Sequence, residues 1–105
     1  MKVGFAILTA VFLSVSTGYA SSGNQKAHGA SLFVDSGCIH CHAIHKVGGH
    51  KGPDLSSVGK RLSEDQIRRQ IVEGSKVMPS FGETLDSTDL EDLLVYLGSC
   101  RDKKK

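Results

Sequence analysis

Two cysteines and four histidines crowd into residues 37–50, GCIHCHAIHKVGGH, in a chain of 105 residues with three cysteines and five histidines altogether. Thiols and imidazoles bind metals, attach prosthetic groups and carry redox chemistry. A further soft donor, the thioether of Met78, follows in the stretch GSKVMPSF. These residue types indicate a metal or cofactor site, and their spacing decides which kind.

Cys38, Cys41 and His42 stand in the Cys-x-x-Cys-His order that marks covalent attachment of a c-type haem. Two thiols three residues apart on one helical turn can each add to a haem vinyl group, and the next histidine presents its imidazole to the iron. Two other interpretations remain open on this motif alone. A redox dithiol would lie near a strand-helix-strand pattern, and a zinc site would recruit His45 or His50 with the thiols.

Met78 favours the haem interpretation. A thioether suits haem iron and raises its reduction potential, whereas zinc prefers thiolate and imidazole ligands. Met78 is followed by Pro79 in a loop after a predicted helix, so we expect it to be the sixth ligand of the iron. The alternative is an apolar side chain that only fills space.

Two helices are expected to flank this chemistry. Residues 26–36 form the first, which ends at Gly37 and carries apolar side chains on one face, namely Ala30, Phe33 and Val34. Residues 63–74 form the second, because SEDQ has the form of a capping box and Gly74 supplies the stop signal. Its isoleucines, Ile67 and Ile71, lie four residues apart on one face.

A third helix follows Asp86, which is expected to cap it, with Asp89 in its first turn. Its leucines follow the amphipathic spacing of a helix that buries one face: Leu90, Leu93, Leu94 and Leu97. The glycine-rich residues 46–55 are expected to form a loop. The elements therefore predict an all-α domain.

Residues 1–20 have the pattern of a secretory signal peptide. Lys2 precedes an apolar run over residues 3–15, and the small residues Gly18 and Ala20 mark a cleavage site after Ala20. A membrane anchor is the alternative, but a spanning helix needs about 20 apolar residues. We therefore expect residues 21–105 to be one exported, periplasmic domain with a basic C-terminal tail and no membrane span.

Composition narrows the function classes. The net charge is only +2, and no basic face interleaved with aromatic residues is visible, so binding to nucleic acid is not expected. The chain has four phenylalanines, two tyrosines and no tryptophan. A small domain with so few large side chains is expected to need a prosthetic group at its centre.

The chain resembles the class I cytochromes c of the small bacterial kind over about residues 27–99. Four stretches stand in the order that is typical of the family: GASLFVDSGCIHCH, GPDLSSVGKRLS, IVEGSKVMPSF and DLEDLLVYL. The resemblance implies the cytochrome c fold, with about three main helices around one covalently attached haem c. It also implies that the Pro53 carbonyl accepts a hydrogen bond from the His42 ring. Three further residues would pair the first helix with the last: Gly29, Phe33 and Tyr96.

Several side chains have roles that the sequence leaves open. We expect Arg61 to bind a haem propionate; the alternative is an exposed charge before a helix. The other histidines are expected to be solvated, without a specific partner: His28, His40, His45 and His50. Cys100, left over from the motif, is a buried apolar residue, an exposed thiol or the site of a disulfide-linked dimer, and we expect a monomer.

Ligation predicts the function. If His42 and Met78 fill both axial positions, no position is open for a substrate, so the protein is not expected to be an enzyme. We expect an exported monohaem carrier that shuttles single electrons between redox protein partners. The alternative is a haem-bearing electron-transfer subunit permanently bound to an exported dehydrogenase.

Overall fold

The structure is a computed structural model that describes Gly4 and residues 22–103. The predicted signal peptide over residues 1–20, including its cleavage site after Ala20, lies outside the described residues except for Gly4, and it stays a prediction. In the part of the chain that the structure describes, no helix is long and apolar enough to cross a membrane.

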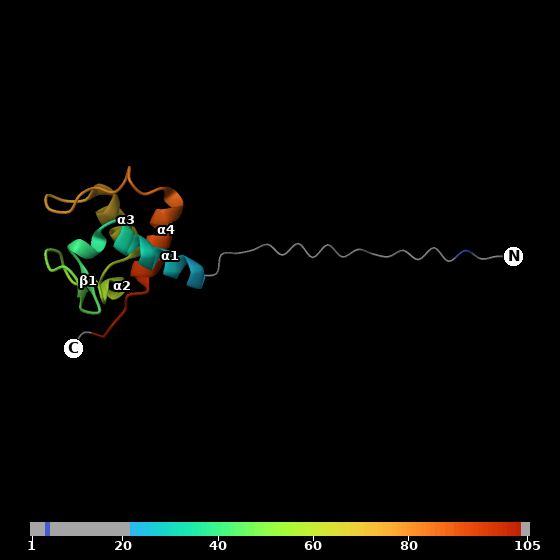
Figure 1. Ribbon diagram of the computed structural model, residues 1–105, viewed down its shortest axis with the longest axis horizontal. Coiled ribbons are helices and arrows are strands. Elements are labelled where there is room, and N and C mark those ends of the chain that lie inside the picture. Colours follow the sequence, from blue (N-terminus) through green and yellow to red (C-terminus); the bar gives the residue numbers. More distant parts are fainter. Residues whose placement is uncertain (1–3, 5–21, 104–105) are drawn as a thin grey trace.

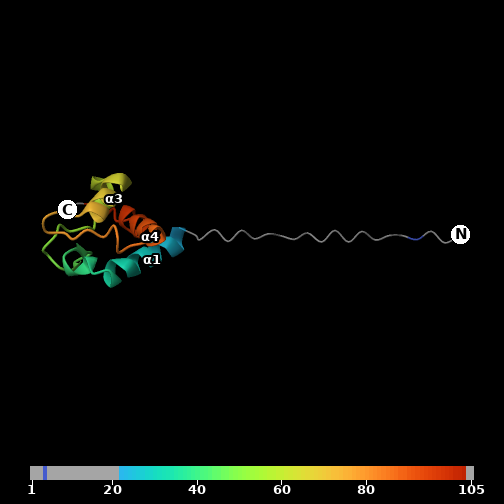
Figure 2. The same cartoon turned by 90° about the horizontal axis from the view of Figure 1, so that it is seen from above.

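Helices dominate the described residues, with one small antiparallel sheet. In chain order the elements are α1 (Ser22–Asp35), the 3₁₀ helix η1 (Cys38–His40), β1 (Ala43–Ile44), β2 (Val47–Gly48), α2 (Val58–Arg61), α3 (Glu64–Glu73) and α4 (Ser87–Gly98). Figures 1 and 2 show the first and last helices, α1 and α4, side by side. The all-α prediction with three main helices is confirmed by α1, α3 and α4.

The α3 helix begins and ends at the predicted signals. The Ser63 hydroxyl oxygen accepts from the Gln66 backbone N–H at 3.2 Å, and the Ser63 N–H donates to Gln66 Oε1 at 2.8 Å, which completes the capping box. Gly74 then ends the helix with a positive φ of 68°. Ile67 and Ile71 are both buried, as their spacing predicts.

The α4 helix also follows its prediction. Asp86 Oδ1 accepts from the Asp89 backbone N–H at 2.7 Å, so the carboxylate satisfies a backbone donor at the positive end of the helix dipole. Of the four leucines in the stripe, Leu93, Leu94 and Leu97 are buried and Leu90 is half-buried.

The crossing of α1 and α4 depends on one small residue. A Cβ atom at Gly29 would lie 2.1 Å from the Asp92 carbonyl oxygen, so only glycine allows the two backbones to approach this closely. One helical turn later, the rings of Phe33 and Tyr96 meet with centroids 6.1 Å apart and planes tilted by 57°. This confirms the pairing implied by the resemblance.

Two details of the first helix were predicted wrongly. The helix begins at Ser22, four residues before the expected start. Val34 is 51% exposed, whereas Phe33 is 3% exposed. Because Gly29 and Phe33 are four residues apart and both face α4, the next residue along lies about 100° further round the helix and points away from the core.

The segment expected to be a loop contains a strand. Residues of β1 and β2 pair with Ile44 opposite Val47, which leaves His45 and Lys46 as a two-residue turn. Both turn residues have positive φ, 51° and 69°, as tight hairpins of the primed type require. Neither is the glycine or asparagine that usually announces such a turn, so the sequence carried no hairpin signal. The single-turn helix α2 was missed as well, because four residues show no periodicity.

The hydrophobic core lies between α1, α3 and α4 and extends to β1 and the C-terminal segment. Its buried members are Phe33, Ile44, Val58, Ile67, Ile71, Leu93, Leu94, Leu97 and Cys100. Cys100 is 6% exposed, and its Sγ lies 3.4 Å from the Tyr96 carbonyl oxygen. Of the alternatives for this residue, the buried one is correct and the exposed thiol is wrong.

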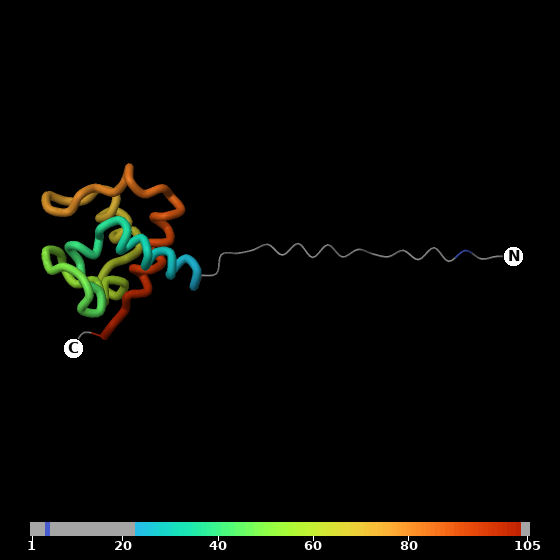
Figure 3. The backbone as a smooth tube through the Cα atoms, in the orientation of Figure 1, coloured from blue at the N-terminus to red at the C-terminus, as the bar shows by residue number. Residues whose placement is uncertain are grey.

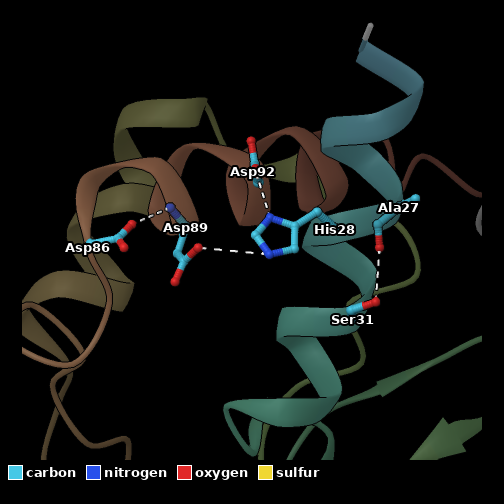
Figure 4. A network of polar contacts seen from close by, with 6 residues as sticks. All are labelled: Ala27, His28, Ser31, Asp86, Asp89 and Asp92. Carbon is cyan, nitrogen blue, oxygen red and sulfur yellow. Dashed lines mark hydrogen bonds and ion pairs between the residues drawn. The ribbon is translucent and has the colours of Figure 1, made fainter. Parts of the chain in front are cut away.

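A histidine joins the two crossing helices at their polar edge (Figure 4). His28 Nδ1 on α1 lies 2.6 Å from Asp92 Oδ2 on α4, and His28 Nε2 lies 3.9 Å from Asp89 Oδ1. The hydrogen bond with Asp92 raises the pKa of His28, and the charges of Asp92, Asp89 and Asp86 add to this effect. His28 therefore has a specific partner, contrary to the expectation of a merely solvated ring.

We predict that this pair makes stability depend on pH. The pKa of His28 in the folded protein is raised above its ordinary value of 6.5. The pair therefore stabilises the folded state fully at pH values below 6.5, and this stabilisation is lost as the pH rises through the folded-state pKa. The urea concentration at the unfolding midpoint of the haem-loaded protein should therefore decrease as the pH is raised from about 5 to about 9. The decrease should be larger in wild type than in His28→Gln. The exposed His50 supplies the control, His50→Gln, which should keep the wild-type slope. Equal slopes for wild type and His28→Gln would contradict the prediction.

Candidate functional site

The motif residues occupy one tight turn after α1. Gly37 has a φ of 86°, a left-handed conformation that lets the chain leave α1 and enter η1 at once. The backbone N–H groups of Cys41 and His42 both donate to the Cys38 carbonyl, at 3.2 and 3.0 Å. The turn thus brings two thiols and one imidazole together. Both motif cysteines are half-buried and form no disulfide bond.

Glycines of the following segment close around this turn. Gly49 donates its N–H to the Ile39 carbonyl at 2.8 Å, and Gly52 donates to the Cys41 carbonyl at 2.7 Å. A Cβ atom at Gly49 would lie 2.0 Å from the His40 carbonyl oxygen, and one at Gly52 would lie 2.4 Å from the His42 ring. Larger residues would displace the motif or its imidazole. Sequence reasoning treated these glycines only as loop residues and missed their contacts with the motif.

His42 is oriented by a single backbone group. Its Nδ1 lies 2.8 Å from the Pro53 carbonyl oxygen. Because a carbonyl only accepts, the ring proton belongs on Nδ1, which leaves the lone pair of Nε2 for a metal. Such a bond fixes the ring orientation and raises the basicity of the coordinating nitrogen. The hydrogen bond that the resemblance implies is thus present, and the part of Pro53 in holding a cofactor stays a prediction.

Arg61 lies beside the same loop. Its Nη2 donates a hydrogen bond to the carbonyl oxygen of Asp54 at 3.1 Å, and Asp54 directly follows Pro53 in the chain. Hydrogen bonds from Ser56 lower the pKa of Asp54, and the charge of Arg61 adds to the effect. Asp54 and Ser56 support the loop, and no sequence pattern had marked them. The predicted contact of Arg61 with a haem propionate stays a prediction.

Met78 lies in the loop that follows α3, which is orange in Figure 3. Ser75 and Met78 close this loop on each other, since the Ser75 N–H donates to the Met78 carbonyl at 2.8 Å and the Met78 N–H donates to Ser75 Oγ at 3.2 Å. Met78 is half-buried and packs against the core, whereas its neighbour Val77 is 82% exposed. The Gln70 side-chain amide on α3 donates to Met78 Sδ at 3.5 Å. No pattern in the sequence indicated this contact.

The residues present fit a covalently attached haem. The donor set of two thiols, one imidazole and one thioether is the set that c-type haem takes. Several apolar side chains pack against the core and remain partly exposed: Ile39, Leu55, Leu62, Phe81, Leu85 and Leu90. Such half-covered apolar surface suits a large apolar ring that completes the core.

The two alternatives for the thiols find less support. Among residues 22–103, no three side chains of the types His, Cys, Asp and Glu gather closely enough to hold a metal ion. Burial raises the pKa of the Cys38 thiol, with a further contribution from Cys41. A reactive dithiol needs a lowered pKa, so Cys38 lacks the property of a redox-active nucleophile.

A surface cavity of about 400 Å³ lies elsewhere, between α2, α3 and α4. Its lining includes Gly59, Ile67 and Leu94, and none of the six predicted site residues contributes to it. The donor chemistry of the motif, rather than this cavity, therefore defines the candidate site.

Residues 24–97 match the family model described as "Cytochrome C oxidase, cbb3-type, subunit III". The chain is 34% identical over 74 residues to the menaquinol:cytochrome c reductase cytochrome c subunit of Bacillus subtilis, covering 70% of this chain and 28% of that relative. It is 32% identical over 101 residues to cytochrome c6 of Synechocystis, covering 90% of this chain and 82% of that relative. No solved structure gives a significant match.

Proposed function

Since the chain belongs to the c-type cytochromes, an electron-transfer family with covalently attached haem c, we propose that it carries single electrons through one haem ligated by His42 and Met78. The observation that supports the proposal is the 2.8 Å contact of His42 Nδ1 with the Pro53 carbonyl oxygen, which leaves the Nε2 lone pair available to a metal. Met78, partly buried in its closed loop, would supply the second protein ligand through its sulfur atom.

Each site residue then has one task. Cys38 and Cys41 would hold the haem through two thioether bonds, each made by addition of an S–H across a vinyl group, so attachment would need no oxidant. His42 donates its Nε2 lone pair, and Pro53 holds the ring in the required orientation. Met78 would donate a sulfur lone pair, and a thioether ligand raises the reduction potential of haem iron. Arg61 is proposed to pair with a propionate.

The bound haem supplies a one-electron iron couple, reduced by one redox protein and oxidised by another, without transfer of a proton or an atom. Because His42 and Met78 would leave no axial position open, the chain binds no substrate at the iron and acts as a carrier rather than an enzyme. Its partners would dock briefly, through a small interface of the kind common among redox encounters.

A freely diffusing carrier is preferred over a bound subunit. The relative named as a reductase subunit is matched over only 28% of its length, whereas the relative named cytochrome c6 is matched over 82%. Likeness over most of a small protein supports a self-sufficient domain. We propose an extracytoplasmic location, on the basis of the signal-peptide pattern in residues 1–20.

Absorption spectra of the exported protein test the proposal. Haem should remain with the polypeptide after acidified-solvent extraction, and the ferric form should show a sulfur-to-iron charge-transfer band. Addition of peroxide should leave the oxidised spectrum six-coordinate. Extractable haem or a five-coordinate ferric spectrum would refute the proposed ligation, and stable co-purification with a dehydrogenase would favour the subunit alternative.

A further inference from the structure

The three residues that follow α4 and its C-cap form a strap across the loop that carries Pro53. This C-terminal strap, residues 100–102, makes two backbone hydrogen bonds to that loop and α2: the Asp102 N–H donates to the Ser56 carbonyl at 3.0 Å, and the Gly59 N–H donates to the Cys100 carbonyl at 2.9 Å. Arg101 adds a third contact, since its Nη1 donates to the Gly59 carbonyl at 2.6 Å. Every residue of the strap thus contacts the segment between Pro53 and α3.

Asp102 also reaches the hairpin that follows His42. Its Oδ2 lies 2.8 Å from His45 Nε2, and the His45 backbone N–H donates to Ser56 Oγ at 2.8 Å. Asp102, His45 and Ser56 therefore form a closed ring of contacts. His45 lies three residues after His42, and Ser56 lies three residues after Pro53. This ring of contacts therefore fixes the distance between the segment that runs from His42 to His45 and the segment that runs from Pro53 to Ser56. The hydrogen bond between His42 and Pro53 lies at the start of both segments.

Cys100 anchors the strap to the core. Its side chain is buried, and a small apolar group at this position fits against the end of α4. The approach is close, because a Cβ atom at Gly59 would lie 2.3 Å from the Gly98 carbonyl oxygen. The core therefore fixes one end of the strap, and Asp102 extends from this fixed end to the two loops.

We propose that the C-terminal strap positions the Pro53 carbonyl against the His42 ring, so that Asp102 and His45 are positioning residues for the ligand histidine. This inference rests on the proposed ligation of haem by His42. Loosening the strap weakens the hydrogen bond that His42 Nδ1 donates, which lowers the basicity of Nε2. A less basic Nε2 stabilises ferric iron less. The reduction potential then rises, and solvent reaches the ring proton more often.

Two truncations of the haem-loaded protein test the strap. A chain that ends at Asp102 loses only the terminal lysines and retains every contact of the strap, so it serves as the control. A chain that ends at Cys100 loses both Asp102 contacts and that of Arg101. NMR should show about tenfold faster exchange of the His42 Nδ1 proton in the shorter chain than in the control, and voltammetry should show a higher potential.

A point substitution separates the strap from a general effect of chain length. The contact between His45 and Asp102 is solvent-exposed, with side chains 65% and 49% exposed, so Asp102→Ala should change the exchange rate by only about threefold. Lys103→Ala should match wild type. If the shorter chain and Asp102→Ala both retain the control's exchange rate and potential, the inference is wrong. A wild-type spectrum without histidine-ligated haem would instead overturn the proposed function.

Discussion

Replacing both Cys38 and Cys41 by serine is expected to release haem to acidified solvent and to leave most of the chain unfolded. Serine keeps the size of the side chain but cannot form the thioether bond. Partly exposed apolar side chains that pack on the core, Leu55 and Phe81 among them, would then lack the apolar ring that we propose completes the core. Loss of a tightly bound group costs about 4 kcal/mol or more, which is comparable with the whole stability of a small domain, about 5–15 kcal/mol.

The third cysteine provides a matched control for this double change. Cys100 is a buried thiol outside the motif, so Cys100→Ser should keep haem covalently attached and leave the absorption spectrum unchanged. Circular dichroism and denaturant titration measure the folding of both variants. A cooperative, helical double variant without haem would contradict the view that the prosthetic group completes the core.

Met78→Ala is expected to leave haem attached while it abolishes sulfur ligation. The charge-transfer band of the ferric protein should vanish, and added imidazole should bind at the vacated position. The potential should drop on the order of 0.1 V or more, within the roughly 0.8 V over which axial ligands tune haem iron. No other methionine is available in residues 21–105, since the chain's second methionine is Met1.

The neighbouring valine distinguishes ligation from a disturbance of the loop. Val77 is 82% exposed and shares the loop with Met78, so Val77→Ala should retain the band and the potential. Survival of the band in Met78→Ala would show that another group ligates the iron. Loss of the band in both variants would show that the loop conformation, rather than this one sulfur atom, determines the spectrum.

Local signals predicted the main helices well. The capping box at Ser63, the cap at Asp86 and the leucine stripe of α4 act within a few residues of chain, and each has a geometry that the sequence expresses directly. The motif at Cys38 and the candidate ligand Met78 were likewise visible as residue types at characteristic spacings.

Contacts between distant segments were not predictable in this way. The contact of His28 with Asp92 joins residues 64 positions apart, and that of His45 with Asp102 depends on a hairpin turn without glycine. Neither histidine carries a local pattern that names its partner. The exposure of Val34 was missed for a related reason, since the angle at which α1 meets α4 decides which side of an apolar stripe is buried.

The packing of α1 against α4 also constrains the order of assembly. These helices are separated by residues 36–86, so during synthesis α1 must wait for nearly the whole chain before it meets its partner. The free energy of loop closure increases by only about 0.6 kcal/mol for each doubling of the loop length. Contacts between segments so far apart in the chain nevertheless form slowly, so α1 docks on α4 late in folding. Cys38 and Cys41 emerge directly after α1 and long before α4. A system that attaches haem to the emerging chain would therefore meet the two thiols before α4 has been made.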